Sequence, residues 1–336
     1  MLGRIRMIGT MLRRAALLAG AAALGLGLAA APTAAQSFPD RPVRVIVPIA
    51  AGGGTDVFAR MLAELASPAL RQPVIVENRP GASGTIGLQA MLDAPRDGHT
   101  ISFIWNAPLT SVPHTLGTRY TMDDFEPMFI VGTAPFTMCV RPNHPAQNAQ
   151  DLLALIRSRP PESISYGNEG AGGTMHLAAE RMFRSLGVQL QAIPFQGAAQ
   201  TLNAFSGGHI DLYGGSVAVV MATARAGNAR CLLLTSADNH PAFPQASGLR
   251  ALGIPQDETT IWWGMIAPRG VPADRIAALQ AAFRQAGATD RFRQMLEQQG
   301  VTPGWVEGAA MGTVMRREYE ELGRVATAIG LQRPAR

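Results

Sequence analysis

The stretch of residues 43–65 has the residue types that bind an anion through the backbone. A β-branched run over 43–47 predicts a buried strand, and the Ala-Ala-Gly-Gly-Gly segment at 50–54 supplies small residues with free backbone angles. Thr55 and Asp56 then offer side-chain oxygens suited to an N-cap, and apolar residues at helical spacing follow them. A strand, a glycine loop and a helix start direct bare N–H groups and the positive end of a helix dipole at one place. The chemistry predicted there is anion binding.

Several side chains beside the glycine loops have a structural as well as a functional interpretation. Asp56 suits a helix cap or a loop brace better than a ligand contact, because a carboxylate would repel an anion. Thr174 suits either the N-cap of the helix that follows it or a donor to a ligand. His176 is expected to be packed or hydrogen-bonded, since no HxH or HExxH spacing accompanies it. Trp105 and the Trp262–Trp263 pair are expected to pack in the core or near a hinge, with one of them facing the ligand as the alternative.

The sequence excludes several enzyme classes. It contains no lysine, which rules out a Walker A loop and a pyridoxal Schiff base. The Gly-Gly-Ser-Val segment at 214–217 lacks the GxSxG spacing, and the glycines at 170–173 do not complete a GxGxxG motif with a suitable acid. No catalytic residue, metal site or cofactor is therefore predicted, and a secreted hydrolase is only a distant alternative.

The N-terminal segment, residues 1–35, is predicted to be a secretory signal peptide. Four arginines precede an apolar run from Ala15 to Ala31, and small residues suited to cleavage lie just before Gln36. The Arg13-Arg14 pair leaves open whether export uses the general or the twin-arginine route. The formal charge of +5 falls to +1 once these four arginines are removed, so no nucleic-acid-binding surface is expected. The predicted location is the periplasm.

The two cysteines, Cys139 and Cys231, each lie in an apolar run. An oxidising periplasm would allow them to pair, but buried free cysteine is common in such runs. The sequence therefore favours two free thiols, with a disulfide as the alternative.

Strand–glycine–helix units recur along the chain and indicate an α/β fold with mainly parallel sheets. Further strands are expected at 73–77, 100–105 and 163–166, and ligands bind at the carboxyl ends of strands in such sheets. Two long apolar segments, Phe125–Arg141 and Trp262–Ala267, are expected to cross between two lobes that face each other across a cleft.

The sequence resembles the Bug (TctC-type) extracytoplasmic solute receptors of tripartite tricarboxylate transporters. The resemblance covers nearly all of the chain after the leader, and its segments follow one another in family order. They are VRVIVPIAAGGGTDVFARMLA, QPVIVENRPGASGTIG, DGHTISF, DFEPMFIVGTAPF, ISYGNEGAGGTMHLAAERMF, IPFQGAAQTLNAFSGGHIDL and WWGMIAPRGVPADRIAALQAAF. The resemblance implies the type II periplasmic binding-protein fold, with two lobes and hinge-crossing strands. Lobe 1 would comprise 36–134 and 263–336, and lobe 2 would comprise 135–262.

The same resemblance implies a receptor and not an enzyme. Such a receptor closes on a small organic carboxylate, held by backbone amides and ordered water, and delivers it to the membrane permease of the transporter. Carried onto this chain, the ligand-binding residues of the first lobe are Ala50, Ala51, Gly52, Gly53, Thr55 and Asn106. Those of the second lobe are Gly170, Gly172, Gly173, Thr174, Gly197 and Ala198.

The chain departs from the family pattern at three places. Gln196 stands where a basic residue precedes the glycine, Gly214 stands where an acid is usual, and the loop around 247–253 is altered. Because Gly214 leaves no obvious partner for an ammonium group, a plain mono- or dicarboxylate is predicted in preference to an amino acid. A receptor for a non-carboxylate ligand, or one that serves a signalling partner, remains the alternative.

Overall fold

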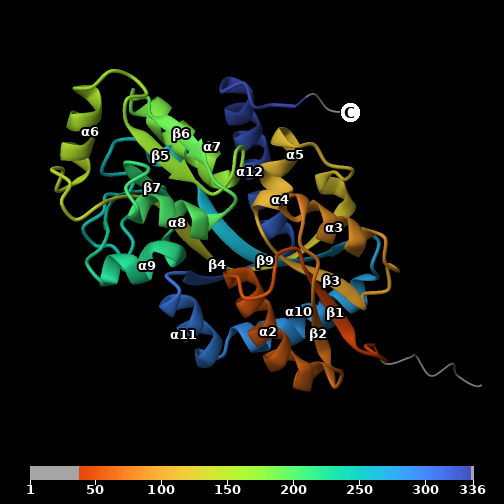
Figure 1. Ribbon diagram of the computed structural model, residues 1–336. Helices are drawn as coiled ribbons and strands as arrows, with labels where there is room; N and C mark the ends of the chain where they lie inside the picture. The colour runs from red at the N-terminus through yellow and green to blue at the C-terminus, as the bar shows by residue number, and fades with distance from the viewer. Residues whose placement is uncertain (1–37, 334–336) are drawn as a thin grey trace, which may run out of the picture. The chain divides into compact units, whose positions relative to one another are not determined.

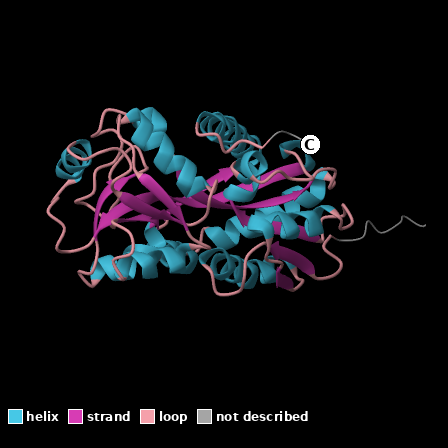
Figure 2. Ribbon diagram, turned by 45° about the horizontal axis from the view of Figure 1, so that its top comes forward, coloured by secondary structure: helices cyan, strands magenta, loops and turns pink. Residues whose placement is uncertain are grey.

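The computed structural model describes residues 38–333, so the predicted signal peptide lies outside the described residues. Within them, strands form one ten-stranded mixed sheet, with helices on both of its faces (Figure 2). Between Phe38 and Arg333 no helix combines the length and the apolar character needed to cross a bilayer.

The elements follow in alternating order, as the sequence predicts. The first part of the chain contains β1 (Val43–Val47), α2 (Gly54–Leu70), β2 (Val74–Asn78), α3 (Thr85–Leu92), β3 (Thr100–Trp105), α4 (Ala107–Thr110), α5 (Val112–Thr115) and β4 (Phe125–Val140). The middle part contains α6 (Ala149–Arg157), β5 (Ser165–Asn168), α7 (Thr174–Ser185), β6 (Gln191–Pro194), α8 (Ala198–Ser206), β7 (Leu212–Ser216), α9 (Val217–Arg225) and β8 (Arg230–Leu234). The last part contains β9 (Thr260–Pro268), α10 (Ala273–Gly287), α11 (Asp290–Gln298), β10 (Thr302–Glu307) and α12 (Gly308–Ala328).

The sheet has two parallel ends joined by antiparallel strands. In one lobe β1 pairs in parallel with β2 and β3, and in the other β5 pairs in parallel with β6 and β7. The strands between them, β9 and β4, pair antiparallel to their neighbours. The expectation of mainly parallel sheets is therefore corrected to a mixed sheet, because the two crossing strands return between the lobes.

The strand β4 carries the chain from one lobe to the other. It pairs with β9 from Phe125 to Pro135 and with β7 from Phe136 onward. Figure 1 shows β4 and β9 running between β1–β3 and β5–β7. The predicted fold class, with two lobes and hinge-crossing strands, is confirmed, whereas the predicted lobe boundaries stay a prediction.

The cysteines form a disulfide, so the favoured expectation of two free thiols is wrong. Cys139 on β4 and Cys231 on β8 are direct partners across an antiparallel pair, and their sulfurs are bonded. The sequence places each cysteine in a buried strand but does not show the register that sets them opposite each other.

Three local features have no counterpart in the sequence analysis. Gly214 and Gly215 continue β7 up to Ser216. The connection after β3 contains the short helices α4 and α5, and β10 was not predicted. Tertiary packing decides these segments, since glycine pairs and short polar runs carry little local preference.

The helix α12 packs against both lobes. It lies against β4 and α4 on one side and against α7 on the other. Leu177 of α7 packs with Leu322 and Ala326 of α12 in one apolar cluster. Arg181 of α7 adds ion pairs to Glu321 of α12 and to Asp257, so this side of the hinge is held together by both apolar and charged contacts.

Candidate functional site

The helix α2 begins with open backbone donors. Gly53 is the N-cap residue, with φ −74° and no side-chain cap. Among the hydrogen bonds of residues 38–333, none uses the backbone N–H of Gly54, Thr55 or Asp56. Ala50, Ala51 and Gly52 lie exposed in the loop before them. A loop after a buried strand therefore leads into a helix whose first amides are free, which is the geometry on which the prediction of anion binding rests.

Asp56 braces this loop and does not cap the helix. Its carboxylate accepts hydrogen bonds from the Gly52 N–H at 2.9 Å, from Asn78 Nδ2 at 2.8 Å and from Arg60 Nε at 3.0 Å. Burial pushes the pKa of Asp56 upward, but the hydrogen bonds outweigh burial and the pKa is lowered. The brace that the sequence predicts for Asp56 is present, and it occupies the Gly52 amide.

Thr55 does not cap the helix either. Its hydroxyl accepts a hydrogen bond from Trp263 Nε1 at 3.1 Å, and the Trp263 ring packs edge-on against Phe58. Trp262 is buried beside it on β9, with its indole N–H directed at a carboxylate. The expectation that this tryptophan pair packs near the hinge is confirmed.

Asn106 lies at the carboxyl end of β3, where a buried carboxylate holds it. Its side-chain amide donates to the Thr260 carbonyl at 2.9 Å and to Glu318 of α12. Glu318 also accepts from Trp262 Nε1 at 2.5 Å, and burial raises the pKa of Glu318 to about 7. The side-chain oxygen of Asn106 is enclosed and has no hydrogen-bond partner in the described residues. The sequence predicted Asn106 but missed Glu318, which lies 212 residues further along the chain.

The glycine loop of the second lobe directs its amides inward. Gly170 N–H donates to Asn168 Oδ1, Gly172 N–H donates to His176 Nδ1, and Gly173 N–H donates to the Gly170 carbonyl. His176 is therefore a hydrogen-bonded histidine, as expected, and burial lowers its pKa. These amides contact the protein, so a ligand would reach them only after the loop rearranges.

The same loop packs directly on the first lobe. Thr115 Oγ1 donates to the Gly172 carbonyl at 3.1 Å, and a Cβ at Gly172 would lie 2.6 Å from Thr115 Cβ. Only glycine permits this approach, and its φ of +71° favours glycine as well. Thr174 is the first residue of α7 and not its N-cap, which is Gly173, and its hydroxyl meets Ser111 Oγ at 3.2 Å.

The second set of open amides lies at the start of α8. Gly197 is the N-cap, and within the described residues the backbone N–H groups of Ala198 and Ala199 have no protein acceptor. Gly197 and Ala198 are both partly exposed. Among the predicted second-lobe residues, these two offer the donors most open to a ligand.

The strand register connects the residues at the junction of the two lobes. Asn106 bonds to Thr260, Thr260 pairs with Pro135, and the next residue, Phe136, pairs with Ser216 at the end of β7. Ser216 N–H in turn donates to Glu169 Oε1 at 3.0 Å. We call Asn106, Thr260, Ser216 and Glu169 the hinge floor. Glu169 was not predicted, because a single glutamate beside a glycine loop has no distinguishing pattern.

Gly214 and its neighbour Gly215 face opposite sides of β7. A Cβ at Gly214 would lie 2.6 Å from the Gly167 carbonyl and from Met175 Cε, so this position faces the core. A Cβ at Gly215 would instead lie 2.8 Å from Glu169 Oε1. The premise that no acid lies at this place is wrong, because Glu169, which directly follows the neighbouring strand β5, has its carboxylate beside Gly215.

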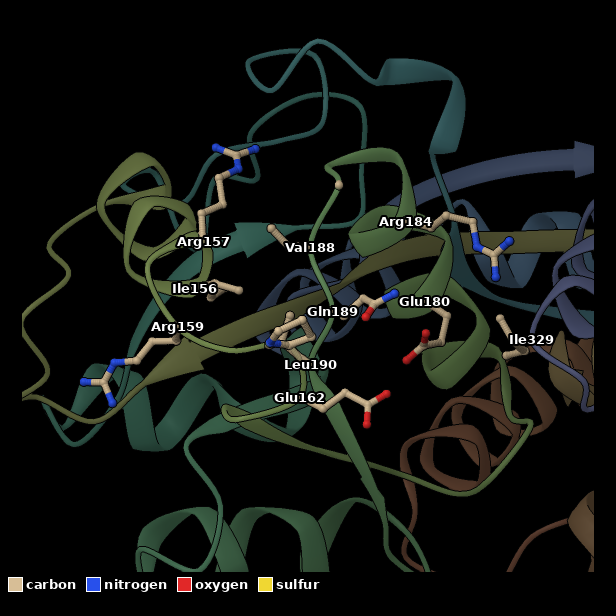
Figure 3. Close-up of a pocket in the computed structure, with 12 residues that line it drawn as sticks. Ile156, Arg157, Arg159, Glu162, Glu180, Arg184, Val188, Gln189, Leu190 and Ile329 are labelled. Carbon is tan, nitrogen blue, oxygen red and sulfur yellow. The ribbon is translucent and has the colours of Figure 1, made fainter.

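A cavity lies elsewhere, lined by residues of α6, α7, the segment 187–190 and Ile329 (Figure 3). It measures about 840 Å³ and includes Arg157, Arg159, Glu162 and Glu180 in its lining. None of the predicted site residues lines it. Nowhere in residues 38–333 do histidine, cysteine, aspartate and glutamate side chains gather as a metal site would require.

Comparison with known proteins identifies the family. The family model for the tripartite tricarboxylate transporter family receptor matches residues 58–331. The chain belongs to this receptor family. It is 32% identical over 312 residues to a UPF0065 protein of Bordetella pertussis, covering 93% of this chain and 96% of that protein. It is 31% identical to protein BugT of the same organism, covering 82% and 85%.

Two solved structures that resemble this chain have the same fold. A TctC solute-binding protein from Polaromonas, solved without ligand, is 31% identical with a TM-score of 0.75, covering 87% of this chain and all of that one. The R. palustris protein Rpa4515, solved with adipate, is 28% identical with a TM-score of 0.76, covering 87% and 98%.

Proposed function

We propose that this receptor is a periplasmic solute-binding protein that captures a small organic mono- or dicarboxylate between its lobes. It delivers the ligand to the permease of a tripartite tricarboxylate transporter and catalyses no reaction. Residues 1–35 would direct its export. The family membership supports the receptor role, and the relative solved with adipate supports a carboxylate ligand.

One observation carries the proposal: the free amides of Gly54, Thr55 and Asp56 at the start of α2. Amides at a helix N-terminus bind a carboxylate through hydrogen bonds and the helix dipole, without any charged side chain. The open amides of Ala198 and Ala199 at the start of α8 lie in the other lobe. A ligand that bonds to both sets would favour the closed arrangement of the lobes, since only closure brings both within reach.

The test replaces Gly53 in two ways. A side chain is tolerated there, because φ is −74° and the nearest neighbour of a Cβ would be Ile49 Cδ1 at 3.5 Å. Gly53→Asp places a carboxylate at the N-cap, where it would accept the free amides itself. We expect it to abolish carboxylate binding while the unliganded protein stays at least as stable as the wild type.

Gly53→Ala is the matched control, which adds a Cβ without a charge and should retain binding. A carboxylate panel in a thermal-shift assay provides the measurement, since a ligand at 100 times its dissociation constant adds about 2.7 kcal/mol of stability. Unchanged affinity in Gly53→Asp, or stabilisation by uncharged compounds alone, would contradict the proposed site.

A further inference from the structure

Glu169 has a carboxylate that the proposed anion site does not explain. The residue follows β5 directly and belongs to the hinge floor, beside the end of β7. Its Oε1 accepts the Ser216 N–H at 3.0 Å and lies close to where a side chain at Gly215 would begin. A Cβ at Gly215 would also collide with the Tyr213 hydroxyl group, so only glycine fits between Tyr213 and Glu169.

The second oxygen of Glu169 is free. In the described part of the chain, Oε2 accepts no hydrogen bond, and it is not among the enclosed polar atoms. No arginine or histidine between Phe38 and Arg333 forms an ion pair with Glu169. One oxygen therefore braces two strand ends, and the other has no hydrogen-bond partner in the described residues, beside the carboxyl ends of β5 and β7.

This acceptor limits which ligands suit the site. A plain diacid would place a second anionic group where Glu169 already stands, and like charges in a partly desolvated site repel. A ligand with an O–H or N–H group would complete the hydrogen bonding of Oε2 and remove the conflict. Burial raises the pKa of Glu169, and the hydrogen bond from the Ser216 N–H opposes this only in part.

We propose that Glu169 is a specificity-determining residue, and that the ligand is a carboxylate that also carries a hydrogen-bond donor, a hydroxyl or an ammonium group, directed at Glu169 Oε2. This inference rests on the proposed function, since the carboxylate itself is held at the start of α2. It reverses the expectation of a plain mono- or dicarboxylate that was based on Gly214.

The experiment compares matched ligands by calorimetric titration. The series are succinate, malate and aspartate; glutarate, 2-hydroxyglutarate and glutamate; and adipate with 2-aminoadipate. In the wild type, the best hydroxy or amino member should bind about 10- to 100-fold tighter than its plain parent, as expected for one hydrogen bond to a charged group. Glu169→Gln should weaken the binding of the amino member more than that of the hydroxy member, because the substitution removes the negative charge that attracts an ammonium group.

Glu169→Gln tests the free oxygen specifically, because it replaces only one of the two carboxylate oxygens. Gln Oε1 can keep the Ser216 N–H, while Nε2 replaces the free acceptor with a donor. The preference for the substituted ligand should disappear, and the plain diacid should bind tighter than it does to the wild type. Glu162→Gln, in an exposed turn of the same lobe, is the control and should leave the preference unchanged.

The outcomes separate the two proposals. Equal binding of plain and substituted acids, with no effect of Glu169→Gln, overturns the role of Glu169 and leaves the carboxylate receptor standing. Tighter binding of plain diacids that weakens as the pH rises shows Glu169 acting as a neutral donor, and it also overturns the inference. If no member of any series binds, the proposed function fails and the inference fails with it.

Discussion

Glu318→Gln tests whether the hinge contains a carboxylate that is costly to ionise. Glu318 accepts hydrogen bonds from Trp262 Nε1, Asn106 Nδ2 and Thr110 Oγ1, with Arg317 as the nearby cation. Burial outweighs these contacts and raises the pKa of Glu318 from 4.5 to about 7. Glutamine keeps both acceptor and donor capacity at this place but cannot ionise.

The sign and size of the effect follow from proton linkage. Between pH 4.5 and 7 the folded protein holds a proton on Glu318 that the unfolded chain has lost, so the free energy of unfolding falls as the pH rises. A pKa difference of about 2.5 corresponds to about 3 kcal/mol of unfolding free energy. This contribution is fully lost above pH 7. Between pH 4.5 and pH 8, the unfolding free energy of the wild type should therefore fall by about 3 kcal/mol relative to that of Glu318→Gln.

Urea unfolding of both proteins at half-unit pH steps gives this difference directly. Other titrating groups, including the buried histidines, cancel because they are common to the two proteins. A difference in unfolding free energy that stays constant from pH 4.5 to 8 would show that Glu318 has an ordinary pKa, and it would refute the picture of a desolvated hinge carboxylate.

Three further changes follow from individual contacts. Replacing Cys139 and Cys231 by serine opens a link across a sequence separation of 92, and we expect a loss of about 4–5 kcal/mol in urea unfolding. Asp56→Ala leaves three donors without their acceptor, so the unfolding free energy should fall by about 2 kcal/mol, and carboxylate affinity should fall with it. Arg181→Met leaves the carboxylate of Asp257 unpaired and should lower the unfolding free energy by about 3 kcal/mol. Adding Asp257→Asn should restore part of this stability in the double variant.

The first strand–loop–helix unit, β1 to α2, could be predicted almost completely from the sequence. The β-branched residues of 43–47 alternate and are nearly all buried, and the glycines that follow end in a helix with open amides. The crossing segments 125–140 and 260–268 were also recognisable, since each is an unusually long or apolar run. These features are local, so the order of residues is enough to predict them.

The cap of α2 and the orientation of β7 could not be read in this way. Thr55 and Asp56 have the residue types of caps, but they bond to Trp263 and to the loop, which are brought close only by the fold. Gly214 and Gly215 are neighbours of the same type, yet one faces the core and the other faces Glu169. The pleat of a strand decides this, and its phase depends on the pairing partner.

The sequence by itself determined the α/β class, the receptor family and the position of the glycine loop before α2, because these depend on patterns within short segments. Only the tertiary structure decided the disulfide, the contact of Glu318 with Asn106 and the place of Glu169 beside β7. Each of these joins residues from separate elements, and strand register and helix packing set their distances. Sequence spacing carries no information on such distances, so these contacts become visible only in the folded chain.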